Sequence, residues 1–372
     1  MNAVDIEPVR TKKDLMSFIK LPWKIYKGDP HWVPPLLMDR RKLLDTKKNP
    51  FYLHSEMEMF LAKRDGEIVG RNAAIINHNH NKFHEEEIGF FGFFESVNDQ
   101  EVANALFDAS KEWITKKGFS AMRGPINPST NDEVGLLVEG FNSSPRILMT
   151  YNPKYYLDLF EGYGLRKEKD LYAYHVNKDK VFTDKLERVT RMITHKEGLT
   201  FRSIDMKHLK EEIKRVKAVY NDAWSKNWGF VPMTDEEFDF LAEDLKQVVE
   251  PDLAIFAEIN GKPVGFALSL PDINQALKHN KNGRLLPGVY HLMTKKKKIH
   301  WVRIMVLGVI RSYQQTGIAA VLFYETAKRA VKLGYFDGEA SWVLEDNLMM
   351  NRSADMMNAT RYKTYRIYKK DF

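Results

Sequence analysis

A strand, a tight loop and a helix follow one another between Arg303 and Gly334, and this junction constrains the fold more than any other stretch. Residues 304–309 read Ile-Met-Val-Leu-Gly-Val and are apolar apart from Gly308, as expected of a strand covered on both faces. Apolar residues then recur at helical spacing from Leu322 to Leu333, and Gly334 supplies a helix-ending cap. Such a junction points backbone N–H groups at one place, where a phosphate binds well.

The residues after this helix continue an α/β pattern. Residues 338–344 predict a second strand, Asn347 caps a further helix, and residues 361–368 alternate like a half-buried strand. Within this order, the spacing Gln314-x-x-Gly317-x-Ala319 resembles the pyrophosphate loop of the GCN5-related N-acetyltransferases, the GNAT superfamily. The resemblance extends from about residue 201 to the end and implies a bound acyl-coenzyme A, either acetyl-CoA or a longer acyl-CoA. The alternative is an ordinary strand-to-helix turn of another α/β domain.

The resemblance also implies which residues touch the cofactor. Backbone groups of Leu307 and Val309, on either side of Gly308, are expected to pair with the pantetheine amide. Asn347 is expected near the pantetheine and the thioester. The pyrophosphate is expected to lie on Arg311, Gln314, Gln315, Thr316, Gly317, Ile318, Ala319 and Ala320.

A second copy of the pattern precedes the first. The hairpin around Asp65-Gly66 is echoed 195 residues later by Asn260-Gly261, and both dipeptides favour two-residue turns with positive φ. Further matches lie at an offset of 216, so the second copy carries an insertion within residues 271–300. The predicted fold class is therefore α/β (α+β), with two tandem GNAT-like domains, each a mixed central sheet flanked by helices. Residues 1–176 form a degenerate copy that ends on the strand-like residues 170–176. Residues 177–199 form a connecting helix, and residues 200–372 form the acyl-CoA-binding domain.

The offset predicts that the first copy does not bind coenzyme A. Gly317 falls on Glu101, and the preceding glutamines fall on Asn98 and Asp99. A carboxylate at this place repels a diphosphate, and a side chain obstructs the backbone cradle. One active and one degenerate copy is also the plan of the Fem-type aminoacyltransferases and the N-myristoyltransferases, although no motif of either family stands out.

Composition excludes several other classes. The chain has no cysteine, so thiolate metal sites and disulfides are excluded, and the start lacks a signal-peptide pattern. We expect a cytoplasmic protein with no stable membrane insertion, no nucleic-acid partner and no metal, and its oligomeric state is open. His78, His80 and His84 are expected in a solvated hairpin rather than a metal site. The net charge of +7 suits an anionic ligand, and residues 295–298, four lysines, are either a solvated loop or a phosphate or anionic-lipid contact.

The residues for proton transfer depart from the GNAT pattern. Arg303 stands where several members carry a glutamate base, and the helix after Asn347 lacks the tyrosine that commonly serves as general acid. The catalytic residues are therefore open, with Glu345, His300 and Glu133 as candidates and Tyr362 among the further ones.

A polar stretch in the first copy is a candidate acceptor pocket. Residues 123–135 follow a predicted strand and hold many polar side chains between glycines and prolines. The alternative is a turn whose Asn and Ser side chains cap the neighbouring backbone. The candidate acceptor residues are Asn127, Asn131, Glu133, Tyr151, Asn152, Trp228 and Asn274.

The leading hypothesis is an acyl-CoA-dependent N-acyltransferase with the cofactor in the carboxyl-terminal domain. The acceptor is expected to be a small-molecule or lipid-like amine in the cleft between the domains. The first alternative is a non-catalytic acyl-CoA sensor or scaffold, and the second is an aminoacyl-tRNA-dependent enzyme of Fem type.

Overall fold

The computed structural model describes residues 3–372, and the chain divides into two compact units. Unit 1 holds the chain up to Asp170 together with Leu277–His291 and Lys363–Phe372. Unit 2 holds Leu171–Ala276 and Leu292–Tyr362. The division therefore falls inside two strands and two helices, each of which contributes residues to both units.

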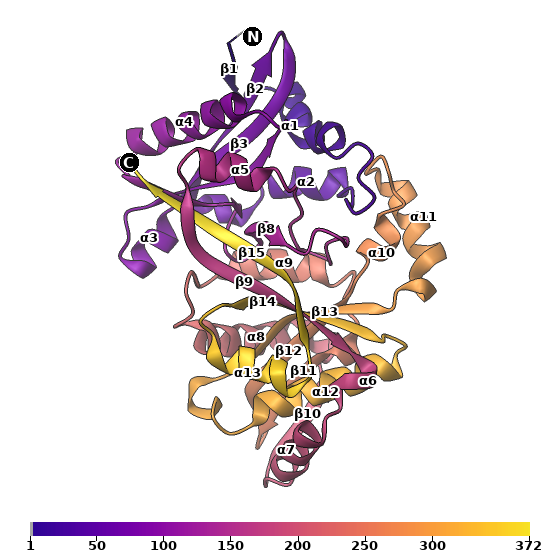
Figure 1. The fold of residues 1–372 in the computed structure, drawn as a ribbon. Coiled ribbons are helices and arrows are strands. Elements are labelled where there is room, and N and C mark those ends of the chain that lie inside the picture. The colour runs from indigo at the N-terminus through magenta and orange to yellow at the C-terminus, as the bar shows by residue number, and fades with distance from the viewer. Residues whose placement is uncertain (1–2) are drawn as a thin grey trace. The chain divides into compact units, whose positions relative to one another are not determined.

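The chain runs through the same order of elements twice (Figure 1). The first pass consists of β1 (Asp5–Pro8), α1 (Lys12–Ile25), α2 (Leu37–Leu43), β2 (Ser55–Arg64), β3 (Glu67–Asn77), β4 (Gly89–Ser96), α4 (Gln100–Lys116), β5 (Ala121–Gly124), α5 (Tyr156–Gly162) and β9 (Arg166–Asn177). The second consists of β10 (Leu199–Ser203), α8 (Leu209–Trp224), α9 (Asp235–Leu245), β11 (Ala254–Ile259), β12 (Lys262–Pro271), β13 (Trp301–Val309), α12 (Ile318–Lys332), β14 (Asp337–Leu344), α13 (Leu348–Met356) and β15 (Thr360–Asp371).

The remaining elements are insertions and connections. The first pass adds η1 (Pro50–Leu53), α3 (His78–His84), β6 (Ile126–Asn127), β7 (Glu133–Val134) and β8 (Leu136–Glu139), and α6 (Lys178–Val181) and α7 (Asp184–Thr194) join the two passes. The second pass adds η2 (Met206–His208), η3 (Pro251–Leu253), α10 (Asn274–Leu277), α11 (Leu285–Lys295), η4 (Lys296–Lys298) and η5 (Arg311–Tyr313). The prediction of a mixed α/β fold made of tandem copies is confirmed.

The two predicted hairpins form as their turn residues require. Asp65 and Gly66 have φ of 53° and 76°, and Asn260 and Gly261 have φ of 51° and 75°. Positive φ at both central positions defines the type I′ turn, whose twist matches that of the flanking strands. β2 then pairs antiparallel with β3, and β11 pairs antiparallel with β12.

The last strand of each pass pairs with the sheet of the other pass. In unit 2, β9 runs antiparallel to β14, from Asp337 opposite Asn177 to Leu344 opposite Leu171. In unit 1, β15 runs antiparallel to β5 and also pairs with β8. The sequence predicts both strands, and the structure shows that they are exchanged between the repeats.

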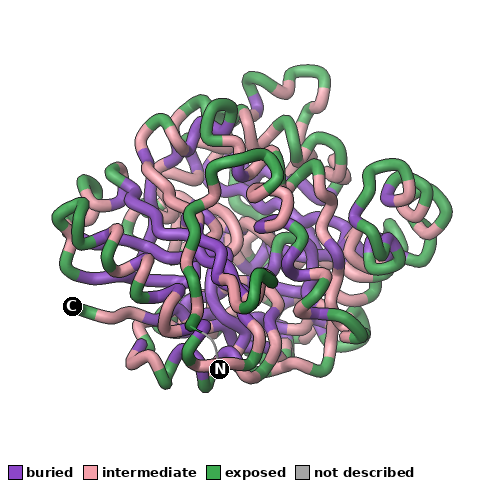
Figure 2. The backbone as a smooth tube through the Cα atoms, turned by 90° about the horizontal axis from the view of Figure 1, so that it is seen from above, coloured by how far each residue is buried: buried purple, intermediate pink, exposed green. Residues whose placement is uncertain are grey.

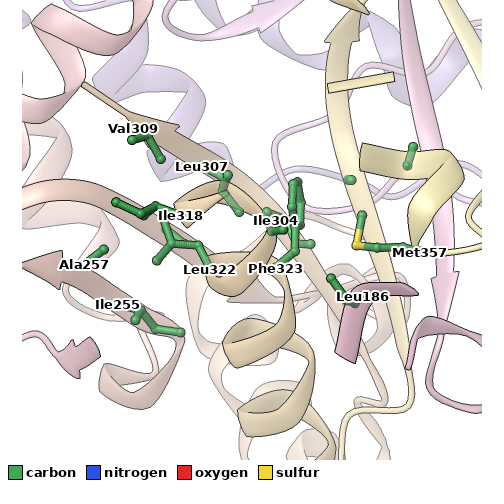
Figure 3. Close-up of a cluster of buried hydrophobic side chains, with 14 of the residues drawn as sticks. Leu186, Ile255, Ala257, Ile304, Leu307, Val309, Ile318, Leu322, Phe323 and Met357 are labelled. Carbon is green, nitrogen blue, oxygen red and sulfur yellow. The ribbon is translucent and has the colours of Figure 1, made fainter. Parts of the chain in front are cut away.

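Each unit has its own apolar core, which runs along the buried strands coloured purple in Figure 2. In unit 2, Ile318, Leu322 and Phe323 of α12 pack against Ile304 and Leu307 of β13 (Figure 3). Burying each large apolar side chain stabilises the fold by about 1.5–3 kcal/mol. These contacts fix the N-terminal end of α12 next to the carboxyl end of β13.

One glycine in each copy explains why α4 and α12 lie close to their sheets. A Cβ on Gly70 would lie 2.7 Å from Leu106 of α4, and a Cβ on Gly265 would lie 3.1 Å from Leu322 of α12. Both glycines therefore let a leucine of the following helix approach the sheet closely.

Three local expectations need correction or extension. The expected hairpin around His80 is instead helix α3, because the Asn77 side chain accepts a hydrogen bond from the His80 N–H and caps a helix there. The insertion within residues 271–300, left without assigned structure by the sequence, forms α10 and α11. The connecting segment, expected as one helix over residues 177–199, instead contains the two helices α6 and α7. Within residues 3–372, no helix is both long and apolar enough to cross a bilayer.

Candidate active site

The loop before α12 ends in a glycine whose conformation suits a bound anion. Gly317 is the N-cap of α12 and has φ of 85°, a left-handed conformation that a non-glycine residue adopts only with strain. Among the described residues, no side chain caps this helix start. The first N–H groups of a helix have no partner within the helix, and they carry a partial positive charge. The start of α12 is therefore a backbone cradle of the kind that binds phosphate groups.

The equivalent helix in the first copy is closed by carboxylates. Asp99 caps α4 and accepts from the N–H groups of Glu101 and Val102. Arg64 forms ion pairs with Asp99 at 2.6 Å and with Glu101 at 2.7 Å. The hydrogen bond with Arg64 lowers the pKa of Asp99, so this carboxyl stays ionised. The helix start that has no side-chain cap among the described residues of α12 is thus capped in α4 by the protein's own negative charge.

The strands before the two helices also differ. Over residues 3–372, β13 pairs with β14 only from Trp301 to Ile304, whereas its pairing with β12 continues to Val309. The Ile310 N–H donates to Val264 O of β12 at 2.9 Å. Because backbone direction alternates along a strand, Gly308 also faces β12, while Leu307 and Val309 turn their N–H and C=O groups away from it. The edge of β13 that faces away from β12 thus presents the backbone groups of Leu307 and Val309, the two residues expected to contact pantetheine.

The corresponding edge in unit 1 is covered by the chain itself. β4 pairs with β5 only at Gly89 and Phe90 within the described chain. Beyond them, a Cβ on Gly92 would lie 1.8 Å from Ile126 O, and the Phe93 N–H donates to Asn127 Oδ1 at 2.6 Å. The short strand β6 therefore covers the edge of β4. The corresponding edge of β13, in the second copy, is the one that carries the outward-facing backbone of Leu307 and Val309.

The loop in unit 2 is held by the end of α8. The Arg311 N–H donates to Asp222 Oδ1 at 2.6 Å, and Gln314 Nε2 donates to Ala223 O at 3.4 Å. Thr316 donates its hydroxyl to Tyr313 O, so these side chains shape the loop. A Cβ on Gly308 would lie 2.2 Å from the Trp224 ring, so only glycine allows that ring to lie against β13.

A buried polar cluster lies where β13 and β14 begin to separate. Arg303 of β13 is opposite Glu339 of β14, and both are almost fully buried. Arg303 donates to the hydroxyl of Ser341 at 2.9 Å, and Ser341 donates to Glu339 at 2.5 Å. Tyr362 of β15 donates its hydroxyl to the other oxygen of Glu339. The position that carries a glutamate base in several GNAT members therefore holds an arginine here, and a carboxylate lies one strand away.

A histidine and an aspartate lie on the same face of this sheet. His175 of β9 is opposite Glu339, and its Nε2 lies 2.8 Å from Oδ1 of Asp337. Asn177 donates to the same oxygen of Asp337 at 2.9 Å. The imidazole stacks on the ring of Trp301 with 4.5 Å between centroids. The side chain of His175 remains 33% exposed. A carboxylate that accepts from Nε2–H leaves Nδ1 as the basic nitrogen of a neutral ring.

In unit 1, the polar residues predicted to bind the acceptor are instead hydrogen-bonded to other groups of the protein. Asn152 is buried, accepts from the Leu137 N–H at 2.7 Å and donates to Leu137 O. Glu133 accepts two hydrogen bonds from Arg40, at 3.0 and 2.5 Å. Tyr151 donates its hydroxyl to Asp29 at 2.9 Å. Burial raises the pKa of Tyr151, and the hydrogen bond with Asp29 raises it further. The Asn131 N–H donates to Ser129 Oγ, and Asn127 holds β4 as described above. These contacts favour the capping alternative for the stretch.

The other predicted residues lie at several places in unit 2. Asn347 caps α13 by accepting from the Met350 N–H at 3.1 Å. Glu345 is partly buried in the turn before it. His300 is exposed, and its Nδ1 lies 3.1 Å from Lys298 O. Trp228 is partly buried in the loop after α8, and Asn274 begins α10.

Comparison with known proteins gives two long matches in sequence. The chain is 38% identical to the bacterial ceramide synthase of Caulobacter vibrioides over 376 residues, covering 99% of this chain and 97% of that protein. It is 34% identical to the protein YghO of Escherichia coli K12 over 367 residues, covering 96% and 93% of the two chains. It therefore belongs to the sequence family of these two proteins. No known family model matches the chain.

Solved structures establish the fold. A GCN5-related N-acetyltransferase from Sphaerobacter thermophilus superposes with a TM-score of 0.56 at 14% identity, over 99% of this chain and 95% of that one. A tandem GNAT protein from the clavulanic acid biosynthesis pathway superposes with a TM-score of 0.58 at 10% identity, over 99% and 98%. The chain therefore has the fold of a tandem GNAT protein. The expectation of two tandem GNAT-like domains is confirmed at the level of the fold.

Sequence reasoning missed the polar residues that this chain gathers on one sheet face. His175, Asp337 and Glu339 come from strands that the sequence predicts, yet none was singled out. Their signal is the alternation of Asp337-Gly-Glu339-Ala-Ser341, which places three polar side chains on one face of a strand whose other face is apolar.

Proposed function

We propose that the chain is an acyl-CoA-dependent N-acyltransferase whose donor binds in unit 2. The observation that carries the proposal is the difference between the two helix starts. α12 begins at Gly317 without a side-chain cap among the described residues, whereas Asp99 caps the start of α4 and Glu101 lies in its first turn. The donor supplies an activated acyl thioester, and its diphosphate fits the cradle before α12. The outward-facing backbone of Leu307 and Val309 suits the amide of pantetheine.

We assign the acceptor to the class of long-chain amino alcohols. The Caulobacter relative is named a ceramide synthase, and a ceramide is a long-chain amino alcohol acylated on its nitrogen. Identity of 38% over almost the whole of both chains supports the same class of acceptor here. In the reaction, the amine nitrogen forms a bond to the acyl carbon, the carbon–sulfur bond breaks, and the amine gives up one proton while the sulfur gains one.

We assign the role of general base to His175. Its Nε2 is held by Asp337 at 2.8 Å, which orients Nδ1 as a proton acceptor. The ring is partly exposed, whereas Glu339 is fully buried and already accepts from Ser341 and Tyr362. A positioned base contributes about 10²–10⁴-fold to the rate of such a reaction.

The test is a steady-state assay of thiol release with acyl-CoA donors from acetyl to palmitoyl, each with a short amine or a long-chain amino alcohol. We expect release only when an amine is present, and a higher kcat/KM for the long-chain acceptor. The variant His175→Gln should lose about 100-fold or more in kcat while binding acyl-CoA as tightly as the wild type. His208→Gln is the matched control, because His208 is an exposed histidine paired with Asp205 at 2.8 Å and is not among the candidate catalytic residues.

One result would count against the transferase function, and another would count only against the assigned base. Tight acyl-CoA binding without turnover for any amine would favour the non-catalytic sensor. Turnover unaffected by His175→Gln would leave the transferase intact but remove the assigned base.

A further inference from the structure

Helix α11 presents apolar side chains to solvent. Leu286 is 82% exposed, Tyr290 63% and Met293 78%. On a helix with 100° between residues, all three lie within about 40° of the direction opposite Gly288. Leu285 and Val289 are exposed beside them. Scattered exposed apolar residues are common, but five on one helix of this length form a continuous apolar face.

The opposite side of the helix is anchored in unit 1. Gly288 is buried, and a Cβ there would lie 2.8 Å from Leu36. The preceding loop is tied down by two further contacts. Trp23 Nε1 donates to Lys281 O at 2.8 Å, and the Leu37 N–H donates to Gly283 O at 2.9 Å. These contacts fix the Gly288 side of the helix against unit 1, so the apolar side chains on the opposite side point to solvent. Helix α11 is the orange helix labelled in Figure 1.

The charge around this face is strongly positive. Residues 273–300 contain seven lysines and arginines and no aspartate or glutamate. The whole chain has 57 basic and 50 acidic residues, so the remainder of the chain holds 50 of each and is neutral. The formal net charge of +7 thus equals the charge of this one segment. Lys296, Lys297 and Lys298 follow α11 directly and are exposed.

We propose that α11 and the lysines after it dock the protein on the surface of an anionic lipid bilayer. An apolar helix face flanked by cations is the pattern of helices that lie in the bilayer interface. The apolar side chains enter the headgroup region, and the lysines pair with anionic headgroups. A second copy of the chain is the less suitable partner, because its equivalent face carries the same positive charge. The inference rests on exposure and charge and does not depend on the proposed transferase activity.

The test is co-sedimentation of the full-length protein with vesicles, without acyl-CoA. Vesicles of phosphatidylcholine with 25% phosphatidylglycerol are compared with pure phosphatidylcholine, at low and high salt. Each lysine near an anionic surface contributes about fivefold to binding, so Lys296→Gln/Lys297→Gln/Lys298→Gln should weaken it about 100-fold at low salt. Leu286→Glu/Met293→Glu should weaken it by at least about 100-fold.

Matched variants separate this face from the rest of the surface. Leu53→Glu/Met192→Glu alters a leucine that is 79% exposed and a methionine that is 69% exposed, with the same change in charge. Lys207→Gln/Lys210→Gln/Lys214→Gln removes three exposed lysines elsewhere. The proposal predicts that both controls bind anionic vesicles within about threefold of the wild type, and that high salt weakens binding.

The proposal is overturned if the α11 variants bind as well as their controls, or if binding ignores both phosphatidylglycerol and salt. It is also overturned if Leu286→Glu/Met293→Glu leaves vesicle binding intact but halves the mass measured by light scattering, because the face would then join two copies. None of these readouts depends on turnover, so a failed docking proposal and a failed transferase proposal are distinguishable.

Discussion

Replacing Gly317 by glutamate should abolish tight acyl-CoA binding, and two other glycine positions allow the cause to be isolated. At φ of 85°, any non-glycine residue costs about 1–2 kcal/mol in backbone strain. A Cβ at Gly317 would also lie 3.0 Å from Ile193 of α7, a contact that a small movement relieves. Gly334, at the other end of α12, has φ of 90° and nothing within 4 Å of its Cβ position. Gly334→Glu therefore carries the same strain and charge without facing the cradle.

The magnitude for binding follows from the charge of the ligand. A carboxylate about 5 Å from a diphosphate of two negative charges costs about 3 kcal/mol at an effective dielectric constant of about 40. That cost corresponds to about 100-fold in the dissociation constant. Loss of access to the N–H groups of the cradle adds to it. Gly317→Glu should thus bind acyl-CoA at least about 100-fold more weakly than Gly334→Glu, although both lose about 1–2 kcal/mol of stability.

Isothermal titration calorimetry with one acyl-CoA measures the binding, and urea unfolding verifies that each variant folds. Glu101→Gly should leave binding unchanged, because Asp99 still caps α4 and Ile126 still covers the edge of β4. The reasoning is refuted if folded Gly317→Glu binds within about twofold of Gly334→Glu. A second binding event in Glu101→Gly would contradict the explanation given for the first copy.

Three further outcomes are expected. Asp337→Asn should lower kcat about tenfold or more with little change in KM, because an amide that donates to His175 reverses the ring tautomer; an unchanged kcat in the thiol-release assay would contradict this role. Hydrogen bonding from His80, opposed by burial and reinforced by Arg123, lowers the pKa of Glu86 to about 2, so its contribution to stability is complete above about pH 4.5 and lost towards pH 2. Urea unfolding of Glu86→Gln should therefore show a deficit at pH 6 that shrinks by pH 3, and a deficit independent of pH would argue against this pair. Leu322→Ala should lower the free energy of unfolding by about 2–5 kcal/mol, because Leu322 is fully buried, whereas the exposed Leu348→Ala should change it by less than about 0.5 kcal/mol.

Local chemistry explains which parts of the fold the sequence predicts. The two hairpins are readable because Asp65-Gly66 and Asn260-Gly261 satisfy a backbone requirement within two residues. The start of α12 is readable for the same reason, since Gly317 supplies the left-handed N-cap. The charges on α4 are likewise visible in the sequence, although the ion pairs of Arg64 with them are not.

The exchange of β9 and β15 has no local signal. Alternation predicts that each segment is a strand, but it does not state which sheet edge the strand joins. Unit 2 gains His175 only because β9 pairs with β14, and this pairing brings the imidazole to Asp337, 162 residues away in the chain. A sequence reading confined to one repeat therefore cannot assemble the polar cluster of the candidate active site.

The polar stretch of unit 1 shows the opposite case. Asn152 and Glu133 carry the side chains expected of a binding pocket, yet they hydrogen-bond the backbone of Leu137 and the guanidinium of Arg40. Residue type and spacing are the same for both roles, so only the contacts distinguish a structural amide from a ligand-binding one.

A crystal structure of the protein with a long-chain acyl-CoA tests the central claim most directly. The account predicts one acyl-CoA per chain, with its diphosphate on the N–H groups at the start of α12 and its pantetheine along Leu307 and Val309. A diphosphate bound at α4, or at neither helix, would contradict the account.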